Sequence, residues 1–422
     1  MTTIGTEHWR KNVVLMWLSQ LLVMAGFDAS IPFVPLLLKD EFGIIAQGER
    51  GVYMSMFVFC GVLAYALFSP VWGTLGDRFG LKIMLLRGTF LTAFLFPLMA
   101  YVAPYVYLLL ILRFLTAACA GTTSASHMLL VKTTPDNKQG FALGVLSTAV
   151  WGGAMLGHVV GGLVVHYYGY MFTFWICGIM YILAGVFVLF CQDAPKTVPV
   201  KHVAGPESVK THRTLLSRLP KFTVSVWLML LLFTLISLVR RFEGPFIPMK
   251  IELIVPDGFA DYWTGLVSAA VSIGALFSGL IIGYLTDKCH PGKLLLPCFI
   301  FSVVFLFVQG KTENIYVLGI TRTLMFFFAG GIIPVFQKIL SGITPQRKRG
   351  SVFGWSYSAQ NTGAMLATFF SGCVIYNWGT PAVFYTAAVL TAVMIPVTLL
   401  IVSKVTHDPY YLVHSDLSEK KS

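Results

Sequence analysis

Long apolar stretches repeat along the whole chain, and they decide which solvent it folds in. About twelve such stretches are separated by charges, Gly and Pro clusters or polar turns. A helix needs roughly 20 mostly apolar residues to cross a bilayer core, and each stretch is about that long. Only 11% of the residues are charged, about half the share of a water-soluble domain. The sequence therefore predicts an all-α integral membrane protein with twelve transmembrane helices.

The predicted spans leave no room for a separate soluble domain. The first span exceeds the apolar core of a signal peptide and contains Asp28, so it is expected to be retained. Neither GxxxxGK[ST] nor HExxH occurs, so neither an ATP-driven pump nor an enzyme is expected. The cysteines are scattered without metal-ligand spacing, so no metal site and no cofactor are expected. The spans are residues 12–38, 50–72, 82–103, 106–130, 139–165, 169–192, 222–249, 263–286, 293–310, 314–341, 349–374 and 381–403.

The net charge of +12 is concentrated on one side of these spans. Loops on the side of the amino terminus hold most of the Lys and Arg residues, whereas those on the other side hold Lys39, Arg50, Lys250 and Lys311. Lys and Arg in short loops mark the cytoplasmic side. We therefore expect both termini in the cytoplasm and the protein in the cell (inner) membrane. Nucleic acid is not an expected partner, because the excess of basic residues is explained by the short loops on the cytoplasmic side of the membrane.

A polar segment divides the chain into two similar halves. Residues 193–221 form the expected cytoplasmic linker between six-helix bundles at residues 1–192 and 222–403, and residues 404–422 form the expected cytoplasmic tail. PFVP at residues 32–35 returns as PFIP at residues 245–248. Parallel six-helix repeats are a transporter architecture, with the solute site between the halves near mid-membrane. Four further pairs differ by 210 positions, namely Pro135/Pro345, Gly140/Gly350, Gly144/Gly354 and Gly153/Gly363.

Three motifs resemble those of a known family. GTLGDRFGLK at residues 73–82 resembles the loop signature of the major facilitator superfamily. LRFLTAACAG at residues 112–121 and GAMLGHVVGG at residues 153–162 resemble motifs of its drug:proton antiporter branch, although His158 stands where that branch has Pro. The resemblance implies the fold of this family, two pseudo-symmetric six-helix bundles that work by alternating access.

The resemblance also assigns two sets of residues to the conformational change. A gate loop is expected to steady the outward-open state through contacts with the other half, and a tight charged turn that only fixes topology is the alternative. The residues of this loop are Gly73, Asp77, Arg78, Gly80, Lys82 and Asp287. A row of small residues is expected to pack helix five on helix eight, as its repeat packs helix eleven on helix two. Generic packing is an equal alternative for this row, which consists of Gly153, Gly157, Gly161 and Gly162.

A few charged residues fall well inside the spans, where charge is costly unless it faces the protein interior. Asp28 and Arg241 each precede a proline by four residues, so a helix turn is opened at each charge. The interpretation is that Asp28 faces Arg241 and Arg240 faces Glu243, either for proton coupling or as static ion pairs. The candidate substrate and proton-coupling residues are Asp28, Arg240, Arg241, Glu243, Arg113 and His158, the last being more typical of a hydrogen-bonded structural histidine.

These features favour a secondary active transporter. The leading hypothesis is a proton-coupled antiporter that exports amphipathic compounds. The alternative is proton-coupled or exchange transport of an anionic metabolite, which the adjacent Arg240 and Arg241 favour because guanidinium groups bind carboxylate and phosphate well. A transport-inactive sensor or scaffold is disfavoured, because no domain or long tail is left for signalling. The expected partners are a small-molecule substrate, protons and the lipid bilayer, and the protein is expected to be a monomer.

Overall fold

A computed structural model describes residues 9–135, 138–193, 222–256, 258–288, 291–345 and 349–406. Nearly all of the predicted linker and most of the predicted tail therefore lie outside the described residues. Within the described ranges the secondary structure is helical, without strands. The prediction of an all-α membrane fold is thereby confirmed.

The first half contains six membrane crossings. Two of them are built from consecutive helices, α1 with α2 and α5 with α6. The elements are α1 (Trp9–Ser30), η1 (Ile31–Phe33), α2 (Val34–Asp40), α3 (Gln47–Phe79), α4 (Leu81–Leu98), η2 (Met99–Tyr101), α5 (Val106–Cys119), α6 (Thr122–Thr133), α7 (Gln139–Tyr168) and α8 (Tyr170–Leu189).

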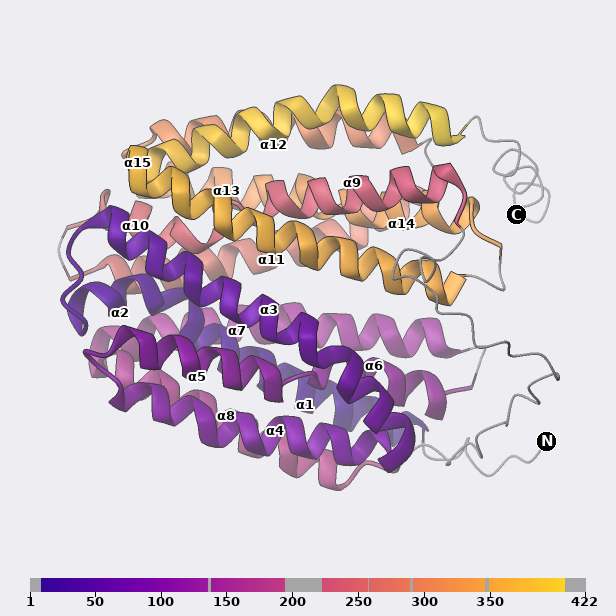
Figure 1. Cartoon of the computed structure of the whole chain (residues 1–422), viewed down its shortest axis with the longest axis horizontal. Helices are drawn as coiled ribbons and strands as arrows, with labels where there is room; N and C mark the ends of the chain where they lie inside the picture. The colour runs from indigo at the N-terminus through magenta and orange to yellow at the C-terminus, as the bar shows by residue number, and fades with distance from the viewer. Residues whose placement is uncertain are drawn as a thin grey trace, which may run out of the picture.

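The second half repeats this order. Its elements are α9 (Val224–Arg240), η5 (Gly244–Phe246), α10 (Ile247–Glu252), α11 (Ala260–Lys288), α12 (Pro291–Lys311), α13 (Ile315–Gly330), α14 (Ile332–Gly342) and α15 (Arg349–Thr406). In α15 the backbone is not helical at Gly379, where φ is 76°. The described chain has 11 candidate membrane spans, and the last, 54 residues long, folds back on itself in Figure 1. A single crossing needs about 20 residues, so this span fits the last two of the twelve expected helices.

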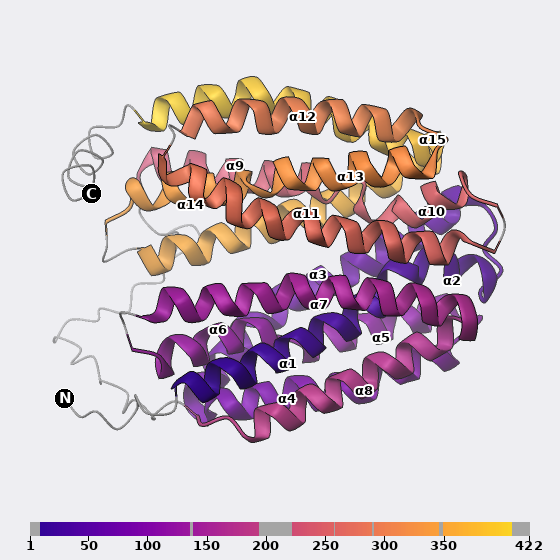
Figure 2. The ribbon, with the colours of Figure 1, turned by 180° about the vertical axis from the view of Figure 1, so that it is seen from behind.

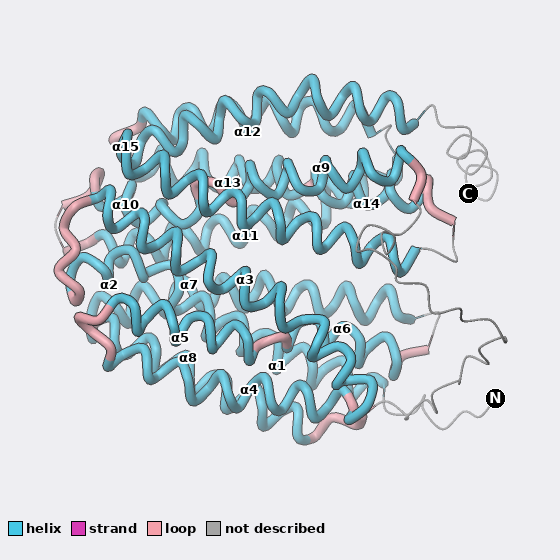
Figure 3. The backbone as a smooth tube through the Cα atoms, viewed as in Figure 1, coloured by secondary structure: helices cyan, strands magenta, loops and turns pink. Residues whose placement is uncertain are grey.

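The halves lie side by side, and both ends of the chain lie at the same end of the molecule (Figures 1 and 2). The halves meet where α7 packs on α11 and α3 packs on α15. One apolar cluster runs through both halves, joining Met54 and Phe57 of α3 to Phe242, Phe246 and Ile375. Figure 3 shows that nearly all non-helical backbone lies at the two ends of the bundle, as expected for a chain whose backbone polar groups must pair inside a membrane.

Two helices at the contact between the halves are broken at their prolines. Between α1 and α2 the chain passes through the 3-10 turn η1, which contains Pro32. Between α9 and α10 the break covers residues 241–246, with Pro245 in η5. A proline lacks the N–H that would continue the helical ladder, so the predicted opening of these turns is confirmed.

The segment predicted as a gate loop is shorter than expected. Its residues 73–79 continue α3 as a helix, and α4 begins at Leu81. Only Gly80 leaves the helical conformation, with φ at 106°, a value that glycine adopts without strain. The expectation of a loop from Gly73 onward is therefore wrong, and the connection is one glycine between two helices.

Candidate functional site

A cavity of about 650 Å³ lies between the two halves. Both broken helices contribute to its wall, through Asp28 and Pro32 from one and Arg241 and Pro245 from the other. Trp151 of α7 and Tyr357, Gln360 and Asn361 of α15 also line it. These residues lie in the halves of their helices nearer the end of the molecule that holds the termini (Figure 1). The cavity wall therefore reaches into that half of the molecule.

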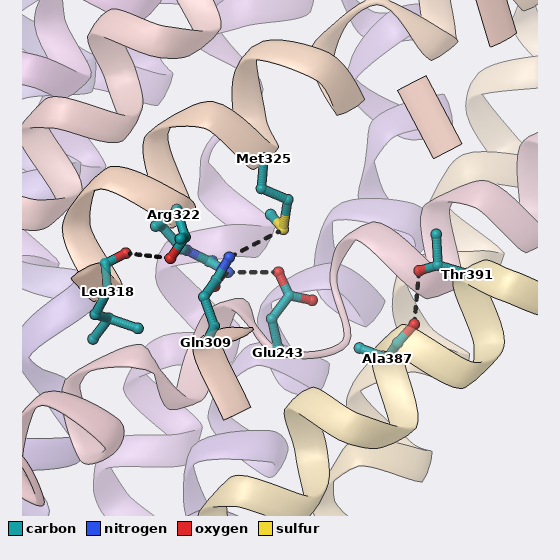
Figure 4. Close-up of polar contacts among 8 residues, drawn as sticks. Glu243, Gln309, Leu318, Arg322, Met325, Ala387 and Thr391 are labelled. Atoms are coloured by element: carbon teal, nitrogen blue, oxygen red, sulfur yellow. Dashed lines mark hydrogen bonds and ion pairs between the residues drawn. The ribbon is translucent and has the colours of Figure 1, made fainter. Parts of the chain in front are cut away.

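The best-defined ion pair beside this cavity joins Glu243 to Arg322. Arg322 Nη1 donates to Glu243 Oε1 at 2.8 Å and to Gln309 Oε1 at 3.4 Å, and Gln309 Nε2 lies 3.7 Å from the sulfur of Met325 (Figure 4). The side chains of Arg322 and Glu243 are 5% and 1% exposed. A buried charge is tolerated when it is paired and hydrogen-bonded in this way.

The predicted pairing of Arg240 with Glu243 is therefore wrong. Arg240 is the last residue of α9, whereas Glu243 lies beyond it in the break. The expected pairing assumed the three-residue spacing of a continuous helix, which does not exist there. Arg322 belongs to α13, and its approach to the break after α9 follows from the fold and not from spacing along the sequence.

The predicted pairing of Asp28 with Arg241 is also wrong. Both side chains line the cavity, but the basic group near Asp28 Oδ1 is Nε2 of His158, at 3.9 Å, which makes an ion pair only when the imidazole is protonated. Ser272 Oγ of α11 lies within hydrogen-bond distance of the other ring nitrogen, Nδ1 of His158, at 3.3 Å. The repeat of residues 32–35 as residues 245–248 makes Asp28 and Arg241 equivalent positions of the two halves. Equivalent positions need not be in contact.

Arg240 and Arg241 face the cavity without a protein partner. Neither forms an ion pair or a side-chain hydrogen bond with any residue in the part of the chain that the structure describes, and Arg241 is exposed. Among the described residues that line the cavity, Asp28 is the one acid, against the three guanidinium groups of Arg240, Arg241 and Arg322, and Glu243 beside it is paired with Arg322. The cavity wall thus carries an excess of positive charge.

Arg113 is not among the side chains that line this cavity. Its guanidinium lies 5.2 Å from the ring centres of both Phe27 and Phe57, within the first half, in an arrangement typical of cation–π contacts. The structure therefore separates Arg113 from the other predicted coupling residues. At the position that Glu243 occupies in the second half, the first half has Ser30, whose hydroxyl donates to the carbonyl of Thr173 at 2.9 Å.

The row of glycines in α7 divides between two neighbours. Gly157 approaches the backbone of α1 so closely that a Cβ would clash with the carbonyl oxygen of Ala25, and Gly153 and Gly161 face α1 in the same way. Only Gly162 faces α11, at Gly265. The expected packing of the fifth span on the eighth is present as α7 on α11. The expected packing of the eleventh span on the second is present as α15 on α3. However, three of the four glycines serve packing within the first half, because small residues also allow close contact there.

Polar contacts join the halves at the end of the molecule away from the termini. Glu252 of α10 lies 2.7 Å from Lys39 and 2.7 Å from Arg50, both of the first half. His166 and Asp261 form a second contact between the halves, at 3.4 Å. These contacts close the cavity at that end. The sequence showed these charges only as outer-loop residues, and their pairing depends on how the two halves meet.

The motif around Gly80 makes its described contacts within the first half. The backbone N–H of Lys82, in the first turn of α4, donates to Asp193 Oδ1 at 3.3 Å, and Lys82 Nζ donates to the carbonyl of Leu189 at 2.7 Å. Asp193 thus caps the amino-terminal end of α4, a place that favours negative charge. Arg78 lies over the ring of Phe79. The surroundings of Gly73 and the side chains of Asp77 and Asp287 are outside the described part of the structure. The role of Asp193 was not predicted from the sequence.

Among the described residues, no group of three His, Cys, Asp or Glu side chains is placed to hold a metal ion.

The chain is similar to known transport proteins along most of its length. A family model described as Major Facilitator Superfamily matches residues 16–250 and 244–413. The multidrug resistance protein MdtG of Escherichia fergusonii is 30% identical over 383 residues, covering 90% of this chain and 92% of that protein. MdtG of Escherichia coli O6:K15:H31 is 29% identical over the same shares.

Solved structures of low identity share the fold. A D-xylose–proton symporter superposes with a TM-score of 0.71 at 16% identity, covering 92% of this chain and 97% of its own. The POT family transporter PepTSo superposes with a TM-score of 0.75 at 13% identity, covering 94% of this chain and 98% of its own.

Proposed function

Because the chain belongs to the major facilitator superfamily and is a multi-pass membrane transporter rather than an enzyme, we propose that it exports amphipathic compounds in exchange for protons. The observation that carries the proposal is the cavity between the halves, closed at one end and lined by Asp28. Its apolar wall, with Trp151, Phe326 and Met54, suits the apolar part of such a compound. The relatives named as multidrug resistance proteins support the same direction of transport.

The proposed orientation places both termini in the cytoplasm of a cell with the protein in its inner membrane. The Lys and Arg residues of the short loops support it, because they are concentrated at the end of the bundle that holds the termini. In that orientation the closed end faces outward and the cavity opens inward. The structure then represents the state that takes up its substrate from the cytoplasm, and one chain holds the whole cavity, so we expect a monomer.

Asp28 is the proposed coupling group. A carboxylate lining a watered cavity at membrane depth is a default candidate for proton binding. If a bound cation or dipole and a proton compete for Asp28, the proton that enters from outside displaces the substrate, which is the coupling that export by exchange requires. Binding of such a compound should therefore strengthen as the pH rises.

A second candidate function, transport of an anionic solute, is favoured by Arg240 and Arg241. Two guanidinium groups without protein partners would hold a carboxylate or phosphate well. Protonation of Asp28 would make the wall more positive and help such an anion to bind. The pH dependence of binding therefore has opposite signs for the two candidates.

The deciding experiment uses two ions of the same shape and opposite charge, tetraphenylphosphonium and tetraphenylborate. Binding of each to the purified protein is measured from pH 5 to pH 8 by equilibrium dialysis. The export proposal expects binding of the cation to strengthen as the pH rises, and expects Asp28→Asn to remove that dependence. Preferred binding of the anion, stronger at low pH and lost in Arg240→Gln, would replace the export proposal by the second candidate.

A further inference from the structure

His158 lies at the seam between the halves, beside two helices other than its own. It belongs to α7, it lies 3.9 Å from Asp28 of α1, and it lies 3.3 Å from Ser272 of α11. The first of these contacts is within one half, and the second crosses to the other half. His158 also lines the cavity, together with both partners. It is therefore the group that links the acid of the cavity to the contact between the halves.

The seam is sealed on the outer side of His158. One turn further along α7, Gly162 packs against Gly265 of α11, and a Cβ at Gly265 would overlap the carbonyl oxygen of His158. Two turns further, His166 pairs with Asp261 of α11. When the halves separate at this end, the contact of His158 with Ser272 must break together with these contacts. The ring nitrogen that faces Ser272 then faces the outer side.

We infer that His158 carries protons from the outer side to Asp28, an inference that rests on the proposed proton coupling. In the outward-open state a proton binds the neutral imidazole, which becomes an imidazolium. The imidazolium gives one proton to the carboxylate of Asp28 and returns to its neutral form. In the inward-open state Asp28 releases that proton into the cavity. The 3.9 Å separation exceeds a hydrogen bond, so the transfer needs a closer approach of the side chains or one bridging water.

The charges around His158 favour passing the proton on rather than keeping it. Asp28, on α1, is the acceptor, and on α11 Ser272 is uncharged while Asp261 is already paired with His166. Arg240 and Arg241 line the same cavity without partners. Their positive charge opposes a lasting imidazolium, since like charges disfavour the protonated form of a base.

The test uses the full-length protein in liposomes, with tetraphenylphosphonium as the probe. Two rates are measured: accumulation driven by an imposed pH gradient, and exchange of labelled for unlabelled probe without a gradient. His158→Gln keeps a hydrogen-bonding side chain that cannot carry a proton. We expect it to lower accumulation by at least about tenfold and to keep exchange within about twofold of the unsubstituted protein. His127→Gln is the matched control, because His127 is a half-buried histidine of α6, and it should leave both rates unchanged.

Other outcomes separate this inference from the proposal on which it rests. Accumulation that survives His158→Gln but is lost in Asp28→Asn overturns the role of His158 and leaves proton coupling intact. Accumulation that survives both substitutions overturns proton coupling itself. Equal loss of accumulation and exchange in His158→Gln, with the protein folded, overturns the carrier role as well, because it shows a general structural need. If His158→Gln does not reach the membrane, His158→Asn is measured in its place.

Discussion

Glu252 carries two of the ion pairs that join the halves at the outer end, and removing its charge should favour opening of that end. Glu252 is paired with Lys39, whose side chain is 34% exposed, and with Arg50, whose side chain is 2% exposed. Glu252→Gln leaves the buried guanidinium of Arg50 without a counter-charge in the closed state only. Breaking a buried pair in this way costs about 3–5 kcal/mol. The lower figure corresponds to roughly a 100-fold shift of the population toward the outward-open state.

The shift can be measured from the distance between two spin labels at the outer end. Ile45 and Phe259 are exposed, one in each half, so labels there report separation of the halves. Lys39→Gln is the control, because an exposed pair is worth at most about 1 kcal/mol, roughly a fivefold shift. Combining Glu252→Gln with Arg50→Gln removes both charges and should restore the closed state. A Glu252→Gln protein no more open than Lys39→Gln would refute the reasoning.

Three further predictions concern packing and polar contacts within the halves. Glu243→Gln leaves Arg322 buried without a counter-charge and should lower the free energy of unfolding of the second half by about 3–5 kcal/mol, seen as a loss of thermal stability in detergent; an unchanged melting temperature would contradict the pairing. Gly157→Leu should reduce the yield of folded protein, because its side chain would collide with α1 at Ala25, whereas Gly144→Leu, at a position with nothing nearby, should not. Gly80→Ala forces a strained backbone at φ 106°, costing of order 1 kcal/mol or more, and a normal melting temperature would show that the turn adapts.

The large features of the fold could be predicted because they follow from local properties of the sequence. Each span needs a run of apolar residues, and each break in helices one and seven needs a proline, as at Pro32 and Pro245. The internal repeat gave the division into halves. The extent of the connection at Gly80 was missed because the charged residues of a helix end and those of a loop look alike in sequence.

The partners of the cavity residues could not be predicted, because they depend on how helices face one another. Symmetry suggested that Asp28 lies opposite Arg241, whereas the structure pairs Asp28 with His158. Helical spacing suggested Arg240 for Glu243, but the broken turn directs Glu243 toward Arg322 of α13. The first pairing was inferred from the symmetry axis alone and the second from the spacing along one helix alone. Which side chains touch depends also on how the neighbouring helices pack.

The difference between Arg322 and Arg113 limits how far the two halves are interchangeable. Arg113 lies eight residues before Gly121, and Arg322 lies eight residues before Gly330, so the two arginines are repeat equivalents. Arg322 has Glu243 beside it, whereas Arg113 lies between aromatic rings, and the first half has Ser30 in place of Glu243. A chain assembled from two copies of the first half would have the right shape. It would hold two arginines like Arg113 among aromatic rings. Its cavity would have Asp28 on one wall and a second copy of Asp28 on the other, and it would lack Arg240 and Arg241. Repetition of one half therefore accounts for the shape of this protein, but not for the ion pair and the unpaired guanidinium groups that only its second half carries.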